Sequence, residues 1–140
     1  NYSGGVIVTK SSDNSIKSFE DLKGRKSAQS ATSNWGKDAK AAGAQILVVD
    51  GLAQSLELIK QGRAEATIND KLAVLDYFKK HPNSGLKIAY DRGDKTPTAF
   101  AFLQGEDALI TKFNQVLEAL RQDGTLKQIS IEWFGYDITQ

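Results

Sequence analysis

Apolar positions along this chain follow two spacings, one typical of strands and one typical of helices. Residues 5–10 are rich in valine and isoleucine, as strands are. Residues 45–49 form a continuous apolar run between turn residues, which predicts a strand buried on both faces. Leu52, Leu56 and Ile59 then recur at helical spacing, and Gly62 follows as a stop signal. The chain is therefore predicted to alternate between strands and helices.

The remaining segments continue this alternation. Further strands are predicted at 25–29, 64–69, 86–90 and 98–103, with helices at 19–23, 34–42, 71–80, 106–122 and 125–133. Such an order is typical of an α/β fold with a parallel, doubly wound sheet. Ligands of these sheets bind beyond the carboxyl ends of the strands, near helix N-termini. The candidate site loops are therefore 29–34, 50–54 and 69–71.

The first candidate loop is the polar turn that contains Ala31, Thr32 and Ser33. It joins a strand to a helix, so it presents free backbone N–H groups and small hydroxyls at the positive end of a helix dipole. This combination suits an anion, and a carboxylate is the natural small one. The alternative is that Thr32 or Ser33 only caps the helix, since junctions of this kind are common.

The second candidate is Asp70, which follows an otherwise apolar strand at the same expected edge of the sheet. A carboxylate there could pair with an ammonium group, or it could only cap the helix that begins at Lys71. Both readings stay open for each residue taken alone. Together, the turn and Asp70 match the two charged ends of a zwitterionic α-amino acid.

Composition excludes several other classes of function. The 140 residues carry 18 basic and 17 acidic side chains, for a net charge of +1, which does not favour nucleic acid as a partner. Cysteine is absent and His81 is the single histidine, so we expect no metal site, no cofactor and no catalytic triad. No apolar run approaches the ~18 residues of a membrane span. The chain also has no methionine, which predicts a processed or truncated piece of a longer protein.

Three stretches of the sequence resemble the family 3 extracellular solute-binding proteins, which are receptors for polar amino acids. Residues 18–26 (SFEDLKGRK) are similar to the family's entry into its second lobe. Residues 62–66 (GRAEA) with Asp70 are similar to a glycine-arginine-acid-alanine stretch that ends in aspartate. Residues 123–126 (DGTL) and 133–135 (WFG) resemble its C-terminal signature. The resemblance is collinear over nearly the whole chain.

The resemblance implies roles for the candidate site residues. Ala31, Thr32 and Ser33 match the turn that binds the ligand's α-carboxylate through backbone N–H groups and a hydroxyl, and Asp70 matches the aspartate that binds the α-ammonium. The family often has glycine where Ala31 stands. Residues 29–35 (QSATSNW) are most similar to the branch that binds cystine or cysteine.

The resemblance also implies a domain organisation of the type II periplasmic-binding-protein fold, with two lobes joined by two crossings. Residues 5–88 would form the complete lobe two, residues 97–140 the returning part of lobe one, and residues 1–4 and 89–96 the crossings. The N-terminal part of lobe one, with the family's carboxylate-clamping arginine, would be missing. The implied protein is an extracytoplasmic receptor, periplasmic or anchored to the membrane, that delivers a polar L-amino acid to the permease of an ABC importer.

Other functions remain as alternatives. Some proteins of this fold are dehydratases of small carboxylic acids, and Asp70, Asp50 or Glu65 could then serve as the general acid or base. A ligand-sensing module and a response-regulator-like domain are less favoured, and the latter needs an acidic pair where residues 10–13 supply one acid. The receptor is favoured over an enzyme, because these three carboxylates are the only candidates for that role. Exposed apolar faces in residues 97–140 are expected to cause self-association or strand exchange.

Overall fold

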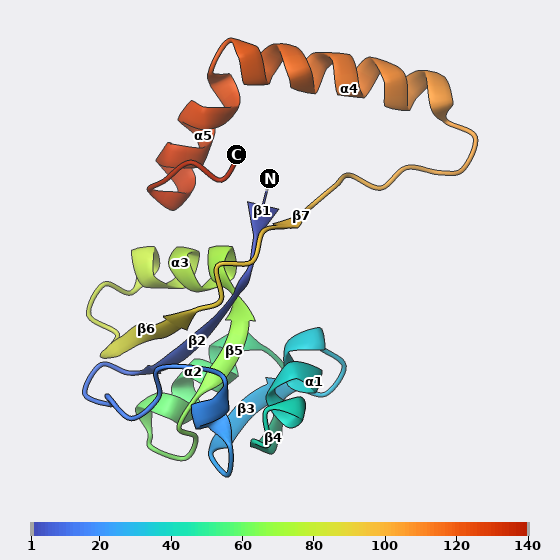
Figure 1. Cartoon of the computed structure of the whole chain (residues 1–140). Coiled ribbons are helices and arrows are strands. Elements are labelled where there is room, and N and C mark those ends of the chain that lie inside the picture. Colours follow the sequence, from blue (N-terminus) through green and yellow to red (C-terminus); the bar gives the residue numbers. More distant parts are fainter. Residues whose placement is uncertain (1, 140) are drawn as a thin grey trace. The chain divides into compact units, whose positions relative to one another are not determined.

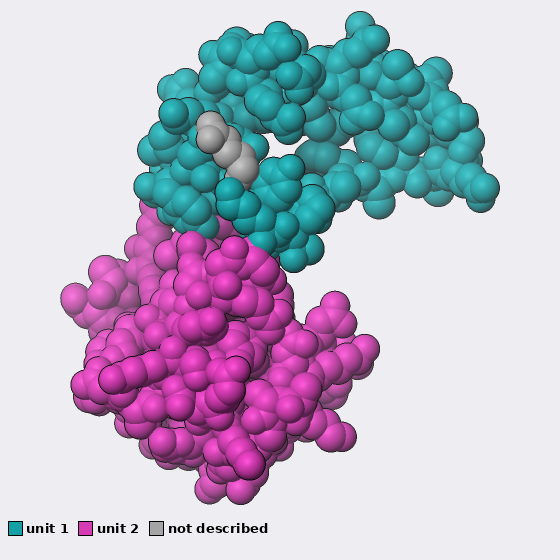
Figure 2. Space-filling model, viewed as in Figure 1, with its two compact units in different colours: residues 1–3, 95–140 teal, residues 4–94 magenta. Residues whose placement is uncertain are grey.

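The computed structural model describes residues 2–139, which divide into two compact units. Unit 2 spans residues 4–94, and unit 1 combines residues 1–3 with residues 95–140 (Figure 2). Among the described residues, no helix has both the length and the apolar character that a membrane crossing requires.

Unit 2 is built from alternating strands and helices, as the sequence pattern predicts. In chain order they are β2 (Gly5–Lys10), the 3₁₀ turn η1 (Glu20–Leu22), β3 (Lys26–Ser30), α1 (Asn34–Ala41), β4 (Gln45–Val49), α2 (Leu52–Lys60), β5 (Thr67–Asp70), α3 (Lys71–Lys80) and β6 (Leu86–Asp91) (Figure 1). The helix predicted at 19–23 is shortened to the single turn η1.

The strands of unit 2 lie in the order β4-β3-β5-β2-β6, and the prediction of an all-parallel sheet is wrong. β3 and β4 pair in parallel, and a short parallel bridge between Ser27 and Ala66 joins β3 to β5. β2, however, pairs antiparallel with both β5 and β6. The crossover through α3 places β5 and β6 one strand apart, and β2 fills the gap in the opposite direction. The periodicity of a strand does not encode its direction, so the sequence pattern could not reveal this.

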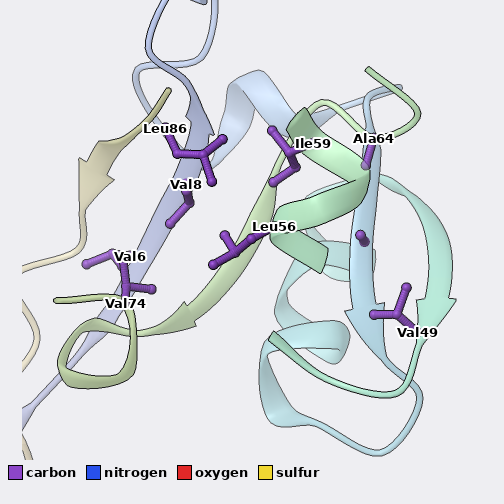
Figure 3. Packing of buried hydrophobic residues seen from close by; sticks show 9 residues of the cluster. Val6, Val8, Val49, Leu56, Ile59, Ala64, Val74 and Leu86 are labelled. Atoms are coloured by element: carbon purple, nitrogen blue, oxygen red, sulfur yellow. The ribbon is translucent and has the colours of Figure 1, made fainter. Parts of the chain in front are cut away.

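The two faces of the sheet carry separate apolar cores, because side chains alternate along each strand. Val6 and Val8 of β2 pack with Leu56 and Ile59 of α2 and Val74 of α3 (Figure 3). On the other face, Ile7 of β2 and Ile68 of β5 pack with residues of α1 and of the 16–22 segment. Helices therefore cover both faces, as predicted for a doubly wound fold.

β4 is an edge strand, and the prediction that residues 45–49 are buried on both faces is wrong. Its one neighbour is β3 among the described residues, and the side chain of Val48 is 68% exposed. Leu47 and Val49 turn towards the core that α2 covers. A continuous apolar run is thus compatible with an edge position, because one of its faces can remain open.

Unit 1 consists of two helices and a short pair of strands. β1 (Tyr2–Ser3) pairs antiparallel with β7 (Thr96–Pro97), and α4 (Asp107–Gln122) is followed by α5 (Thr125–Phe134). The strand predicted at 98–103 is absent, because no strand among residues 2–139 pairs with that segment. Instead, Phe100 and Phe102 both pack edge-to-face against Phe113 of α4.

Glu65 links the beginning of β3 to the segment before β5, and its ionisation should contribute to stability. Its carboxylate accepts hydrogen bonds from the Lys26 backbone N–H (2.9 Å) and the Arg25 guanidinium (2.8 Å), and these hold the pKa of Glu65 below its ordinary value of 4.5. A group whose pKa is lower in the folded protein than in the unfolded chain stabilises the fold at pH values above its unfolded-state pKa. This contribution disappears as the pH falls through its folded-state pKa.

We therefore expect Glu65→Gln to lower the urea midpoint near neutral pH, and we expect this difference from the wild type to shrink as the pH falls and the wild-type carboxylate is protonated as well. Urea denaturation followed by circular dichroism between about pH 6 and pH 3 measures this difference. An equal loss of stability at both ends of that range would contradict the expectation.

Candidate ligand site

The loops singled out from the sequence come together at one edge of the sheet. β4, β3 and β5 are neighbours that run in parallel, with Ser30 of β3 opposite Val49 of β4 and Ser27 opposite Ala66, which directly precedes β5. Their carboxyl ends therefore emerge on the same side of the sheet. The turn at 30–33, the Asp50 loop and Asp70 all lie at this edge, and α1, α2 and α3 begin there.

The turn at 30–33 is held by the side chain of Ser33, which caps α1. The Ser33 hydroxyl accepts a hydrogen bond from the Gly36 N–H (2.9 Å) and donates one to the Ser30 carbonyl (3.2 Å). Ala31 and Thr32 are exposed. Among residues 2–139, the N–H groups of Asn34 and Trp35 have no acceptor, as expected for the first turn of a helix. The turn thus presents free donors to an anion.

Asp70 is both the last residue of β5 and the cap of α3. Its Oδ1 accepts hydrogen bonds from the backbone N–H groups of Leu72 (2.8 Å) and Ala73 (3.4 Å). The capping interpretation is therefore correct for both Ser33 and Asp70. Capping does not preclude ligand binding at Asp70, because both of these bonds use the same carboxylate oxygen.

Trp35, which follows the turn, packs on Gly5 of β2, and Gly5 is the residue paired with Asp70 of β5. A Cβ atom placed on Gly5 would lie 2.7 Å from the Trp35 ring, so the indole packs directly on the backbone of β2. Gly5 stands opposite Asp70 in the β2–β5 ladder, where paired Cα atoms lie about 5 Å apart. Trp35, in the first turn of α1, and Asp70 thus adjoin the same residue. The sequence analysis did not identify Trp35 or Gly5 as part of this arrangement.

Charged groups beside Asp70 are paired with one another. Lys71 binds Asp91 of β6 at 2.6 Å, and Arg92 binds Asp38 of α1 at 2.8 Å. Burial would raise the pKa of Asp91, but the hydrogen bonds from Lys71 and from the Gly93 N–H outweigh it and keep this pKa below its ordinary value. The Arg92 guanidinium also lies over the ring of Phe19, with 4.4 Å to its centroid. Arg92 therefore ties α1 to the end of β6.

The other candidate residues are placed less favourably for chemistry on a ligand. Glu65 precedes β5 and pairs with Arg25, at the opposite ends of the strands from Asp70. Asp50 is exposed at the end of β4, where its N–H donates to Gln54. His81 stacks on Tyr77 at the end of α3. Within residues 2–139, no cluster of histidine, aspartate and glutamate could hold a metal ion.

A surface groove of about 510 Å³ lies beside the edge strand and does not coincide with this arrangement. Leu47, Val48 and Val49 of β4 line it, together with Leu58 of α2 and the basic side chain of Arg63. Neither the turn at 30–33 nor Asp70 belongs to it. The candidate ligand site is therefore an open edge of unit 2.

The mixed five-stranded order with helices on both faces is the type II periplasmic-binding-protein fold, and comparison with solved structures shows the same. The L-cystine solute receptor of Neisseria gonorrhoeae, in its unliganded open conformation, matches with a TM-score of 0.82 and 50% identity over 99% of this chain and 59% of that one. An ancestral amino-acid-binding protein, a precursor of cyclohexadienyl dehydratase, matches with a TM-score of 0.78 and 28% identity over 96% of this chain and 59% of that one.

The chain belongs to the bacterial extracellular solute-binding proteins, family 3, whose model matches residues 1–136. A Haemophilus influenzae protein named "Probable amino-acid ABC transporter-binding protein" is 99% identical over all of this chain and 54% of its own length. The L-cystine-binding protein TcyA of Bacillus subtilis is 46% identical over 99% of this chain and 52% of its own length. The chain thus spans about half the length of these relatives.

The packing of Trp35 on Gly5 yields a prediction about the site's framework. Gly5→Ala would force the indole from the backbone of β2, and overpacking of this kind costs about 1–3 kcal/mol. Gly51→Ala is the matched control, because a Cβ there meets nothing within 4 Å, and we expect a change within about 0.5 kcal/mol. Urea denaturation measures both. Equal stabilities for the two variants would show that the packing of Trp35 does not require a glycine at position 5.

Proposed function

We propose that this chain is the ligand-binding part of an extracytoplasmic receptor that delivers a polar L-amino acid to the permease of an ABC importer. Cystine and cysteine are the favoured ligands. The observation that carries the proposal is the position of the 30–33 turn and of Asp70 at the carboxyl ends of neighbouring parallel strands. Two of the relatives support this choice of ligand, because one is named an L-cystine-binding protein and the other an L-cystine solute receptor.

In this proposal the two charged ends of the amino acid are bound by different elements. The α-carboxylate accepts hydrogen bonds from free N–H groups at the start of α1 and from the Thr32 hydroxyl, and Ala31 and Ser33 complete the contact. Ser33 would have to turn its hydroxyl away from the Ser30 carbonyl to donate as well. Each charge-assisted bond contributes about 1.5–3 kcal/mol. The α-ammonium binds the Asp70 carboxylate.

The domain organisation expected from the sequence is part of this proposal. Residues 5–88 would be lobe two, residues 97–140 the returning part of lobe one, and residues 1–4 and 89–96 the crossings. The division of the chain near residues 4 and 94 supports two crossings, as does the pairing of Tyr2 with Pro97 and of Ser3 with Thr96. Residue 1 and residue 140 lie outside the described part of the chain.

The receptor function would involve no chemical step. All of the relatives above are named as binding proteins or receptors. One of them, an ancestral amino-acid-binding protein, is also named as the precursor of a dehydratase. A dehydratase needs a general acid or base directed at its substrate. Asp70 is assigned to the ligand's ammonium in this proposal, Glu65 is paired with Arg25 away from the site, and Asp50 is exposed at the end of β4. We therefore propose a periplasmic or membrane-anchored receptor without catalytic residues, cofactor or nucleic-acid partner.

Self-association is proposed for unit 1, because the apolar side chains of its long helix are left largely exposed. None of the residues of α4 is buried, and Leu109 and Val116 are 50% and 48% exposed. Light scattering of this chain should therefore show a mass that rises with concentration, and Leu109→Glu with Val116→Glu should reduce it. Lys112→Glu on the same helix is the control for added negative charge. A monomer at every concentration would contradict this proposal.

Asp70→Asn separates the two roles of this residue and tests the proposed function. Asparagine caps helices as well as aspartate does, so the melting temperature should change little. The ammonium, however, loses its charged partner, and we expect L-cystine affinity to fall by at least tenfold. The measurement is isothermal titration calorimetry on the full-length Haemophilus influenzae relative, which is 99% identical over this chain.

Asp76→Asn is a matched control, because Asp76 lies on α3 and pairs with Lys80 away from the site. It should bind as the wild type does. Undiminished cystine affinity in Asp70→Asn would show that Asp70 is a capping residue alone. A wild-type protein that bound none of the polar amino acids would overturn the receptor function itself.

A further inference from the structure

The parallel ladder between β3 and β5 stops one residue after it begins. The Ala66 N–H donates to the Lys26 carbonyl (3.3 Å), and the Ala28 N–H donates to the Ala66 carbonyl (2.9 Å). A regular parallel ladder would continue with the Ile68 N–H donating to the Ala28 carbonyl. Within residues 2–139, no backbone hydrogen bond joins these two residues. The interruption lies immediately before the candidate ligand site.

Two buried polar side chains take the places of the missing backbone bonds. The Thr67 hydroxyl donates to the Ala28 carbonyl at 2.7 Å. In the amide orientation that satisfies all of its neighbours, Gln29 accepts from the Ile68 N–H (2.6 Å) and donates to the Ile68 carbonyl (3.1 Å), and its oxygen also accepts from the Ser27 hydroxyl (3.0 Å). Gln29 is 1% exposed and Thr67 is fully buried.

Such an arrangement requires space between the strands. Backbones that bond directly in a sheet lie about 4.8 Å apart, and an amide group inserted between them needs a wider separation. An apolar side chain at either position would fill the core equally well without any need for polar partners. Gln29 comes directly before the turn at 30–33, and Ile68 comes two residues before Asp70. The separation at this point therefore sets the distance between the two halves of the site.

We propose that Gln29 and Thr67 are positioning residues, which hold β3 and β5 apart so that a zwitterion fits between the turn and Asp70. This inference rests on the receptor function proposed above and adds to it the device that sets the spacing of the site. Neither side chain contacts the ligand. Without them the ladder closes, Ile68 bonds to Ala28, and the carboxylate and ammonium positions move together.

The test compares stability with affinity. Gln29→Leu leaves the Ile68 backbone groups unpaired, so it lowers both the melting temperature and the affinity. Adding Thr67→Val frees the Ala28 carbonyl for the Ile68 N–H, so the double variant regains melting temperature while its affinity for L-cystine stays at least tenfold below wild type. Melting curves and calorimetry on the full-length Haemophilus influenzae relative measure the two quantities. A residue with a purely structural role would not separate them.

Two further variants control for indirect effects. Ser27→Ala removes one bond to Gln29 but leaves its pair with Ile68, and its affinity should stay within twofold of wild type. Gln29→Asn keeps the amide on a shorter side chain, and we expect it to weaken binding with a smaller change in melting temperature than Gln29→Leu. The proposal is overturned if the double variant binds within twofold of wild type, or if its affinity recovers together with its melting temperature.

A second measurement on the 140-residue chain needs no ligand. Scalar coupling across a hydrogen bond, detected by NMR between the Ile68 nitrogen and the Ala28 carbonyl carbon, should be absent in the wild type and present in the double variant. Coupling in the wild type, or no coupling in the double variant, would refute the proposal that Gln29 and Thr67 hold β3 and β5 apart. Failure of the wild-type receptor to bind any amino acid, with the coupling as expected, would instead count against the receptor function.

Discussion

The short parallel contact between β3 and β5 places the turn at 30–33 and Asp70 at the same edge of the sheet. It is one bridge long, between Ser27 and Ala66, yet it fixes the direction in which both strands end. Because the strands end together, the free N–H groups of α1 and the carboxylate of Asp70 lie at the same edge of the sheet. The proposed function requires both groups to be within reach of one small molecule. The remainder of unit 2, with its separate apolar core on each face of the sheet, keeps these two strands in place.

In the proposed function, capping and ligand binding use the same residues at this edge. Ser33 and Asp70 each stabilise the start of a helix, and a cap of this kind typically contributes about 1 kcal/mol. At the start of α1 the N–H groups of Asn34 and Trp35 remain unpaired beside the capping Ser33, where the positive end of the helix dipole favours an anion. A site built on caps is already ordered before the ligand arrives. Preorganisation of this kind reduces the entropy cost of binding.

Sequence reasoning predicted the elements better than their arrangement. The limits of α2 and α3 agree with the predicted ranges, because glycine, aspartate and proline mark their ends. The reversed direction of β2 was not predictable, since an apolar strand reads the same in both directions. The strand predicted at 98–103 is not formed, because a strand requires a partner that no described residue supplies. At the site, Ser33 and Asp70 stood out as polar residues at strand ends. Gln29 and Trp35 did not, because their roles come from Ile68 and Gly5, which are distant in sequence.

A crystal structure of the full-length Haemophilus influenzae relative with L-cystine bound would test this account most directly. The account predicts the α-carboxylate of the ligand within hydrogen-bonding distance of the N–H groups that begin α1, and its α-ammonium within that distance of Asp70. A ligand bound elsewhere, for example in the groove beside β4, or bound with its two charged ends reversed, would contradict it.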